Sequence, residues 1–381
     1  MLLFMSRPNN SADRPVHPGR ILRRMMEAKG WTQDEVATIT GSSRQTIYSI
    51  MAGRSNISPE MAVALAAAFG NTPEEWLQWD GLYRLSMADK DVSEVERLAR
   101  IYEAAPIRDM QKRGWIEPTI DPVELESQLK TFFASDLIDG DISFPIAPRR
   151  TVKLPKLTSA EKAWCFRAKQ LSETLIVDSF STKKLDKAEK RLRELAAFPK
   201  EARHIAKVLA GCGIRFLIVE PIPNVKIDGA TFWLKDGPVI AMSIRYDRID
   251  GFWFTLMHEF AHVIHGDASV DADLVDGVKG IAVRLEEDGA ERLANERAST
   301  SMIPAAELQS FIRRVGPLYQ RERIVQFAHK TKIHPGIIVG QLQYRKEIGY
   351  SALREFLVKV REIVTSTALT DGWNQIVTPG A

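Results

Sequence analysis

Residues 255–266, TLMHEFAHVIHG, place two histidines and a glutamate in a segment that otherwise has the composition of a core helix. A helix over this segment carries apolar side chains on nearly every face, so we expect it to be buried. Burying two imidazoles and a carboxylate is costly unless each group finds a partner, and a metal ion supplies one. We expect the helix to begin with Asp250 as its N-cap and to end at Gly266.

The spacing of these residues indicates which of them would bind the metal. His258 and His262 are four positions apart, so both rings project from one helix face and suit a tetrahedral zinc ion. Glu259 lies off that row and is expected to act as the general base. His265 could compete as a ligand, but we favour a supporting or capping role for it. The alternative is a pair of core histidines satisfied by hydrogen bonds.

A third ligand is expected from residues 291–304, ERLANERASTSMIP. Glu291 falls in the first turn of a helix predicted over residues 289–302. Asn295, four positions later, shares the face of Glu291. It is expected to fix the orientation of His258 by contacting this ligand instead of the metal. Alanines on the same face let this helix approach the first one closely. Together the two segments predict a zinc site with two imidazole ligands and one carboxylate.

The two segments FWFTLMHEFAHVIHG and ERLANERASTSMIP resemble the ImmA/IrrE family of metallopeptidases, which share the zinc arrangement of the gluzincins. The likeness covers about residues 200–345. It implies a zinc endopeptidase that cleaves a repressor or antitoxin protein, or the linker of this chain itself. It also implies that a strand over residues 238–245 lies at the edge of the cleft and holds an extended peptide by strand addition.

A second motif lies near the N-terminus, over residues 32–53. Thr32 opens a helix with a capping-box pattern, Gly41 makes a tight turn, and Ser42 or Ser43 opens a second helix, which is the spacing of a helix-turn-helix. Arginine reads guanine and glutamine reads adenine in the major groove, so we expect DNA contacts from the second helix and its flanks. The predicted contact residues are Gln33, Ser43, Arg44, Gln45, Tyr48 and Arg54.

The stretch from His17 to Leu77 also resembles HigA-type antitoxins of the XRE/lambda-repressor-like group. This resemblance implies binding to operator DNA as a homodimer, with two half-sites about 34–36 Å apart, and it leaves a toxin open as a further partner. The alternative is a helical bundle used for contacts with another protein. A rival to the enzyme is an antitoxin or autorepressor whose metal domain binds a toxin or senses a ligand.

Length and composition limit the class of protein. With 381 residues, 45% of them hydrophobic and 27% charged, the chain is expected to be soluble and to form two or three domains. The two cysteines are far apart and lack CxxC spacing, which favours buried thiols and the reducing cytoplasm over a disulfide framework. No apolar stretch approaches the length of a membrane span, so we expect no membrane partner.

We predict a mostly α, α+β chain with an N-terminal lambda-repressor-like domain and a C-terminal gluzincin-like domain. Short apolar β-type runs lie at 214–222, 231–234 and 238–246, and the HExxH helix follows them. The expected organisation is a tail at 1–16, a helix-turn-helix domain at 17–85, a helical connector or wrap at 86–200, a metallopeptidase domain at 201–365 and a loose tail at 366–381.

Overall fold

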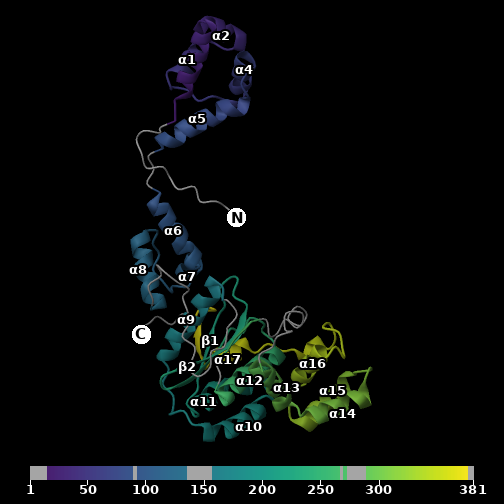
Figure 1. Ribbon diagram of the computed structural model, residues 1–381. Coiled ribbons are helices and arrows are strands. Elements are labelled where there is room, and N and C mark those ends of the chain that lie inside the picture. The colour runs from purple at the N-terminus through teal and green to yellow at the C-terminus, as the bar shows by residue number, and fades with distance from the viewer. Residues whose placement is uncertain (1–14, 89–91, 135–156, 267–268, 273–288, 376–381) are drawn as a thin grey trace. The chain divides into compact units, whose positions relative to one another are not determined.

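The computed structural model describes residues 15–88, 92–134, 157–266, 269–272 and 289–375. The chain divides into two compact units, Met1–Ser93 and Glu94–Ala381 (Figure 1). Most of the expected N-terminal tail, part of the expected connector, most of the polar loop after the HExxH helix and the last six residues lie outside the described part. The overall composition of the fold, mostly helical with a small mixed sheet, is as predicted.

The N-terminal unit is a bundle of five helices with short loops: α1 (Pro18–Lys29), α2 (Gln33–Thr40), α3 (Arg44–Met51), α4 (Pro59–Phe69) and α5 (Pro73–Met87). The predicted capping box is present, because Thr32 accepts from the Glu35 amide and the Glu35 carboxylate accepts from the Thr32 amide. Gly41 ends α2 in the left-handed conformation that glycine adopts easily. Apolar side chains from all five helices share one core, including Leu22, Val36, Ile47, Leu65 and Trp76.

The second unit is built on a mixed sheet with the strand order β4-β2-β3-β1-β5. Its strands are β1 (Arg215–Val219), β2 (Ile227–Leu234), β3 (Gly237–Met242), β4 (Ser269–Ala272) and β5 (Leu369–Asp371). β1 is parallel to β3 and β5, whereas β2 is antiparallel to β3 and β4. Both edges of β3 are therefore paired. The expectation that residues 238–245 form the cleft edge and hold a peptide by strand addition is wrong, because β2 already occupies that edge of β3.

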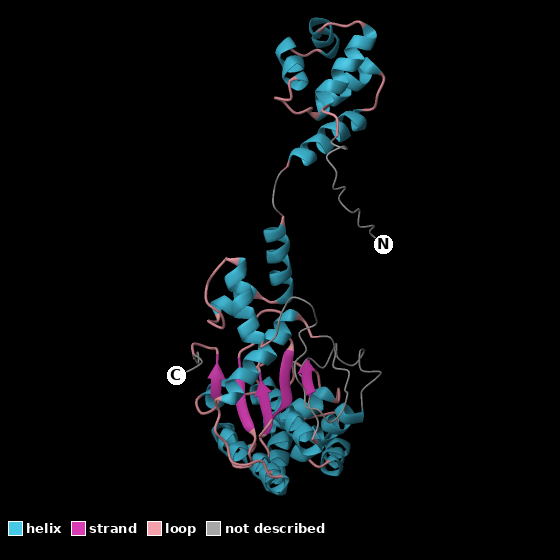
Figure 2. Cartoon of the chain, turned by 60° about the vertical axis from the view of Figure 1, so that its left-hand side comes forward, coloured by secondary structure: helices cyan, strands magenta, loops and turns pink. Residues whose placement is uncertain are grey.

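Helices cover both faces of this sheet (Figures 1 and 2). Alternate residues of the strands face opposite layers: Phe216 and Ile218 of β1 join one core, and Leu217 and Val219 join the other. Burial on both faces explains why the strands are nearly continuous apolar runs. The layer with the HExxH helix contains α10 (Leu185–Leu195), α11 (Ile205–Ala210), α12 (Ile249–His265), α13 (Gly289–Met302), α14 (Ala305–Val315), α15 (Arg321–Thr331), α16 (Pro335–Tyr344) and α17 (Arg361–Thr365).

The opposite layer is formed by much of the segment that we expected to be a helical connector or wrap, and the structure agrees with the wrap. It contains α6 (Ser93–Ala104), α7 (Ile107–Lys112), α8 (Pro122–Phe133) and α9 (Ser159–Glu173). α9 packs against β1, and the fully buried Trp164 donates its indole N–H to the Val219 carbonyl at 3.0 Å. The structure therefore assigns the described residues after Ser93 to the core of the second unit. A connector alone would leave one face of the apolar sheet exposed, which explains why this segment covers it.

The described part of the expected loose tail is also ordered structure. Residues 369–371 form β5, which pairs with β1, and the carboxylate of Asp371 is fully buried. Asp371 accepts from the guanidinium groups of Arg167 and Arg113 and, at 3.1 Å, from the indole N–H of Trp115. These contacts join the end of the sheet to the preceding helical layer. Treating residues 366–375 as a tail was wrong, because their main partners lie more than 140 residues earlier in the chain.

Both cysteines are buried and free, as expected from their separation. Burial raises the pKa of the Cys165 thiol and of the Cys212 thiol. Raised pKa values make thiolates scarce, and thiolates are the form that binds metal and attacks electrophiles. These residues therefore act as small apolar groups in the two cores. In the part of the chain that the structure describes, no helix is long and apolar enough to cross a membrane.

Candidate metal centre and helix-turn-helix surface

The HExxH motif lies on α12, which is buried along almost its whole length. The helix begins at Ile249, and its N-cap position is occupied by Arg248, two residues before the expected Asp250. Asp250 is therefore not the cap, because its carboxylate binds the Arg248 guanidinium at 2.7 Å. Gly266 ends the helix in the left-handed conformation, as predicted. Apolar residues around α12 hold it between the sheet and α16 and thus fix the direction of its polar side chains.

His258, His262 and Glu291 converge on one point, as predicted from sequence. The two imidazole Nε2 atoms lie 3.0 Å apart. Each of them lies 3.4 Å from a different oxygen of the Glu291 carboxylate. The imidazoles are buried, whereas the Glu291 side chain is 33% exposed, so the site opens toward solvent on the side of Glu291.

These distances fit a tetrahedral zinc ion. Zinc binds imidazole nitrogen and carboxylate oxygen at about 2.0–2.2 Å, so two ligand atoms in tetrahedral geometry lie about 3.3 Å apart. The three distances of 3.0–3.4 Å agree with that value. Two imidazoles and one carboxylate also match the donor set of catalytic zinc sites. Among the described histidine, cysteine and acidic residues, no fourth side chain joins this group.

Glu259 is not one of the three converging groups, and its carboxylate contacts strand β2. Its carboxylate is fully buried and accepts a 2.6 Å hydrogen bond from the Thr231 hydroxyl. Gly229, two residues earlier on the strand, lies so close that a Cβ atom there would come within 2.3 Å of Glu259 Oε1. Thr231 and Gly229 were missed in the sequence, which carries no local signal that this strand would pack on the helix. Together they fix the direction of the Glu259 carboxylate.

The helix that carries Glu291 packs closely against α12. Ala294 and Ala298 are buried at this contact, as expected for small residues that allow a close approach. On the other side of α13, Arg297 forms a two-bond ion pair with Glu189 of α10, at 2.7 and 3.1 Å. This bond raises the pKa of the Arg297 guanidinium. The ion pair holds the ligand helix between α12 and α10.

The structure does not test the roles of the two residues expected to support the site. Asn295 is half-buried, and its Oδ1 accepts no hydrogen bond from the described residues, so its role in orienting His258 stays a prediction. His265 is exposed at the last turn of α12 and is not part of the converging group. Its position in the last turn, directly before Gly266, is compatible with the capping alternative, so the expected supporting or capping role stays a prediction. Because it is exposed, His265 is a natural control for His262.

In the N-terminal unit, most of the residues predicted to contact DNA are exposed. Arg44 and Gln45 lie in the first turn of α3, and Arg44 is 3.5 Å from Asp34 in an exposed ion pair. Tyr48 follows one turn later, with the Arg54 guanidinium over its ring at 5.8 Å. Gln33 opens α2 and is half-buried. Ser43 caps α3 by accepting from the Thr46 amide at 3.0 Å.

A family model described as helix-turn-helix matches residues 22–77. The N-terminal unit is an XRE-type helix-turn-helix domain. This domain is similar to antitoxin HigA-1 of Vibrio cholerae, which is 40% identical over 65 residues, or 17% of this chain and 61% of that protein. The HTH-type transcriptional regulator YddM of Escherichia coli is 29% identical over 84 residues, or 22% of this chain and 88% of that protein.

A solved structure of an addiction module antidote protein of the HigA family from Coxiella burnetii is also similar, with 31% identity. The match covers 20% of this chain and 84% of that one, with a TM-score of 0.19. The helix-turn-helix family match and the similarity to antitoxin HigA-1 confirm the prediction of an XRE-type helix-turn-helix domain similar to HigA-type antitoxins. The resemblance of the second unit to metallopeptidases stays a prediction.

Proposed function

We propose that this chain is a cytoplasmic regulator that binds operator DNA and carries a zinc-dependent endopeptidase in its second unit. The resemblance to the ImmA/IrrE family suggests a repressor or antitoxin protein, or this chain itself, as the substrate. One observation supports the enzymatic part: two imidazoles and a carboxylate converge, with one ligand atom of each lying within 4.8 Å of the others, and the glutamate next to His258 in sequence is buried and is not one of them. A purely structural zinc site does not need that glutamate, and it would usually have a fourth Cys or His ligand.

Each residue of the site has a separate role in peptide hydrolysis. His258, His262 and Glu291 would hold zinc, which when bound supplies a Lewis acid for the peptide carbonyl and for water. Glu259 accepts a proton from the attacking water as its oxygen bonds to the carbonyl carbon. The same carboxylate then gives that proton to the leaving nitrogen as the C–N bond breaks. The Thr231 hydroxyl holds Glu259 in the orientation that both transfers require.

Metal binding is the first test of this proposal. We expect the purified full chain to contain about one zinc ion per molecule. His262→Ala removes a ligand and should weaken zinc binding at least about 100-fold, measured by titration against a chromophoric chelator. His265→Ala is the matched control, because this histidine is exposed and should leave affinity unchanged. Equal zinc affinities in the two variants would contradict the ligand assignment.

Peptide cleavage is tested with fluorescently labelled casein and, separately, with the chain itself. We expect release of labelled fragments, its loss on adding a chelator and its recovery on adding zinc. If the zinc-loaded chain cleaves neither protein, the peptidase function is contradicted and the rival function is supported. In that case the chain would be an antitoxin or autorepressor, which the similarity to antitoxin HigA-1 favours, and its metal domain would bind a toxin or sense a ligand.

Operator binding depends on α3, which we propose to be the recognition helix of a homodimer. Gln45 is exposed and forms no helix cap, so Gln45→Ala should weaken binding without unfolding the domain. A lost bidentate contact to a base costs about 1–3 kcal/mol, or roughly 5- to 150-fold in affinity. The measurement is a fluorescence-anisotropy titration with the promoter DNA upstream of the gene for this chain. Gln78→Ala on the exposed surface of α5 is the control and should bind as tightly as the unchanged chain.

A further inference from the structure

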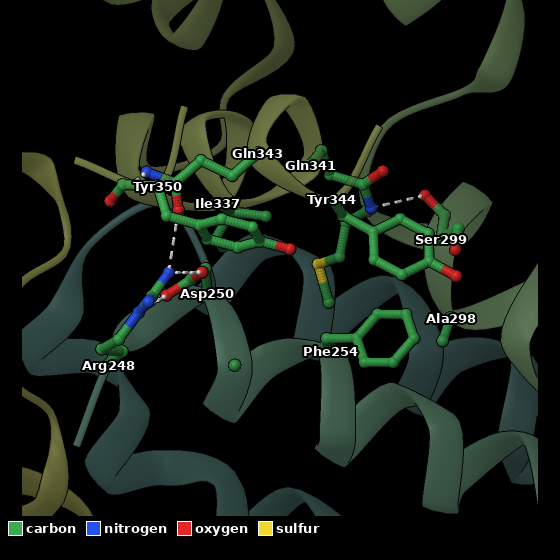
Figure 3. Close-up of a pocket in the computed structure, with 13 residues that line it drawn as sticks. Arg248, Asp250, Phe254, Ala298, Ser299, Ile337, Gln341, Gln343, Tyr344 and Tyr350 are labelled. Atoms are coloured by element: carbon green, nitrogen blue, oxygen red, sulfur yellow. Dashed lines mark hydrogen bonds and ion pairs between the residues drawn. The ribbon is translucent and has the colours of Figure 1, made fainter. Parts of the chain in front are cut away.

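A pocket next to the candidate metal centre has no role in the mechanism above (Figure 3). It is an open hollow of about 690 Å³, including the solvent at its mouth, and lies between α12, α13 and α16. Phe254, Met302 and Ile337 give it apolar walls, one from each helix. The ring of Phe254 in the pocket wall lies 6.2 Å from the ring of His258, centroid to centroid, so the pocket adjoins the metal centre on the side of His258.

The aromatic residues of the pocket suit a flat ring. Phe254 and Tyr344 lie with their centroids 6.5 Å apart and their planes inclined by only 30°. A ring inserted between two others needs about 3.5 Å on each side, or about 7 Å in total. Tyr344 is 48% exposed, so its ring can move by the few tenths of an ångström that insertion requires. In Figure 3 both rings face the hollow.

The charged residues at the rim already neutralise each other. The Arg248 guanidinium donates to both oxygens of Asp250, at 2.7 and 3.1 Å, and to the side-chain oxygen of Gln343. Gln341 donates its amide to the Ser299 carbonyl at 3.2 Å. A carboxylate or an ammonium group would have to break these bonds to find a partner. The pocket therefore favours an uncharged aromatic group.

We propose that this pocket binds an aromatic side chain of the polypeptide substrate, about two residues from the bond that is cleaved. The position follows from the spacing on α12: Phe254 precedes His258 by four residues, which is about 6 Å of helix. An extended substrate chain lying alongside α12 advances about 3.3 Å per residue, so two residues span that distance. This inference rests on the proposed peptidase function and adds its specificity.

The experiment has two arms, both with the full chain. In the first, N-acetylphenylalaninamide should bind at least about 3-fold more tightly than N-acetylleucinamide, as measured by NMR titration. Tyr344→Ala removes one aromatic wall and should abolish this preference, whereas Tyr344→Phe keeps the ring and should retain it. Because Tyr344 is about half exposed, neither change should unfold the unit. Equal binding of the two amides, or a preference that survives in Tyr344→Ala, overturns the proposal.

In the second arm, cleavage sites in casein are mapped by mass spectrometry. We expect phenylalanine, tyrosine and tryptophan to be enriched two positions from the cut, and Tyr344→Ala to lose this enrichment. Cleavage with no aromatic preference overturns the inference and leaves the peptidase function standing. Absence of cleavage overturns both the peptidase function and the substrate role, even where the first arm finds an aromatic-binding pocket.

Discussion

A Glu259→Gln variant is expected to keep its zinc and to lose peptide cleavage by roughly 10²- to 10⁴-fold. Glutamine has the shape of glutamate but cannot accept a proton from water at neutral pH. The three residues that converge as candidate ligands do not include Glu259, so the metal should bind with unchanged affinity. The measurement is the initial rate of casein cleavage at equal zinc content.

Two controls distinguish the loss of the general base from damage to the fold. The Thr231 hydroxyl can donate to an amide oxygen as well as to a carboxylate, so Glu259→Gln should retain the thermal stability of the unit. Thr231→Val removes that donor and keeps the carboxylate, so cleavage should slow by a smaller factor, roughly 10-fold. Cleavage by Glu259→Gln at the rate of the unchanged chain would rule out Glu259 as the base.

The converging residues could be predicted because two of them are placed by a single helix. His258 and His262 meet through the helical repeat alone, whatever the rest of the chain does. Glu291 was predicted from the face that it shares with small residues, and the structure places it 3.4 Å from each of the two histidines. The helix-turn-helix was predictable for the same reason, because its caps and turn are local.

Contacts that depend on the sheet could not be predicted in this way. Gly229 and Thr231 approach Glu259 only because β2 packs beside α12, and strand order is not encoded in a local pattern. The same reason explains why β3 was assigned to the edge of the cleft. The segment after Met87 was interpreted as a connector or wrap because it is polar and interrupted by prolines. Its apolar positions face a sheet whose first strand begins only at Arg215, later in the chain.

Asp371→Ala is expected to lower the free energy of unfolding of the second unit by about 3–5 kcal/mol. Asp371 is fully buried, and so is Arg167, to which it is bonded. Removing the carboxylate leaves a buried guanidinium charge without its counter-ion, and it also takes away one acceptor each from Arg113 and Trp115. The loss should appear in urea denaturation of the full chain followed by far-UV circular dichroism.

The double variant Asp371→Ala, Arg167→Leu distinguishes an unpaired charge from a loss of packing. Replacing both members of a buried ion pair with apolar groups removes the uncompensated charge, so the double variant should regain much of the stability lost by Asp371→Ala. Asp178→Ala is the control for a carboxylate whose ion pair, with Lys184, is exposed, and it should cost at most about 1 kcal/mol. If Asp371→Ala lowered the free energy of unfolding by no more than Asp178→Ala does, the residues expected to form a C-terminal tail would not stabilise the unit through Asp371. A large loss instead means that the helices before the sheet and strand β5 fold as one cooperative unit, with Asp371 as the contact between them.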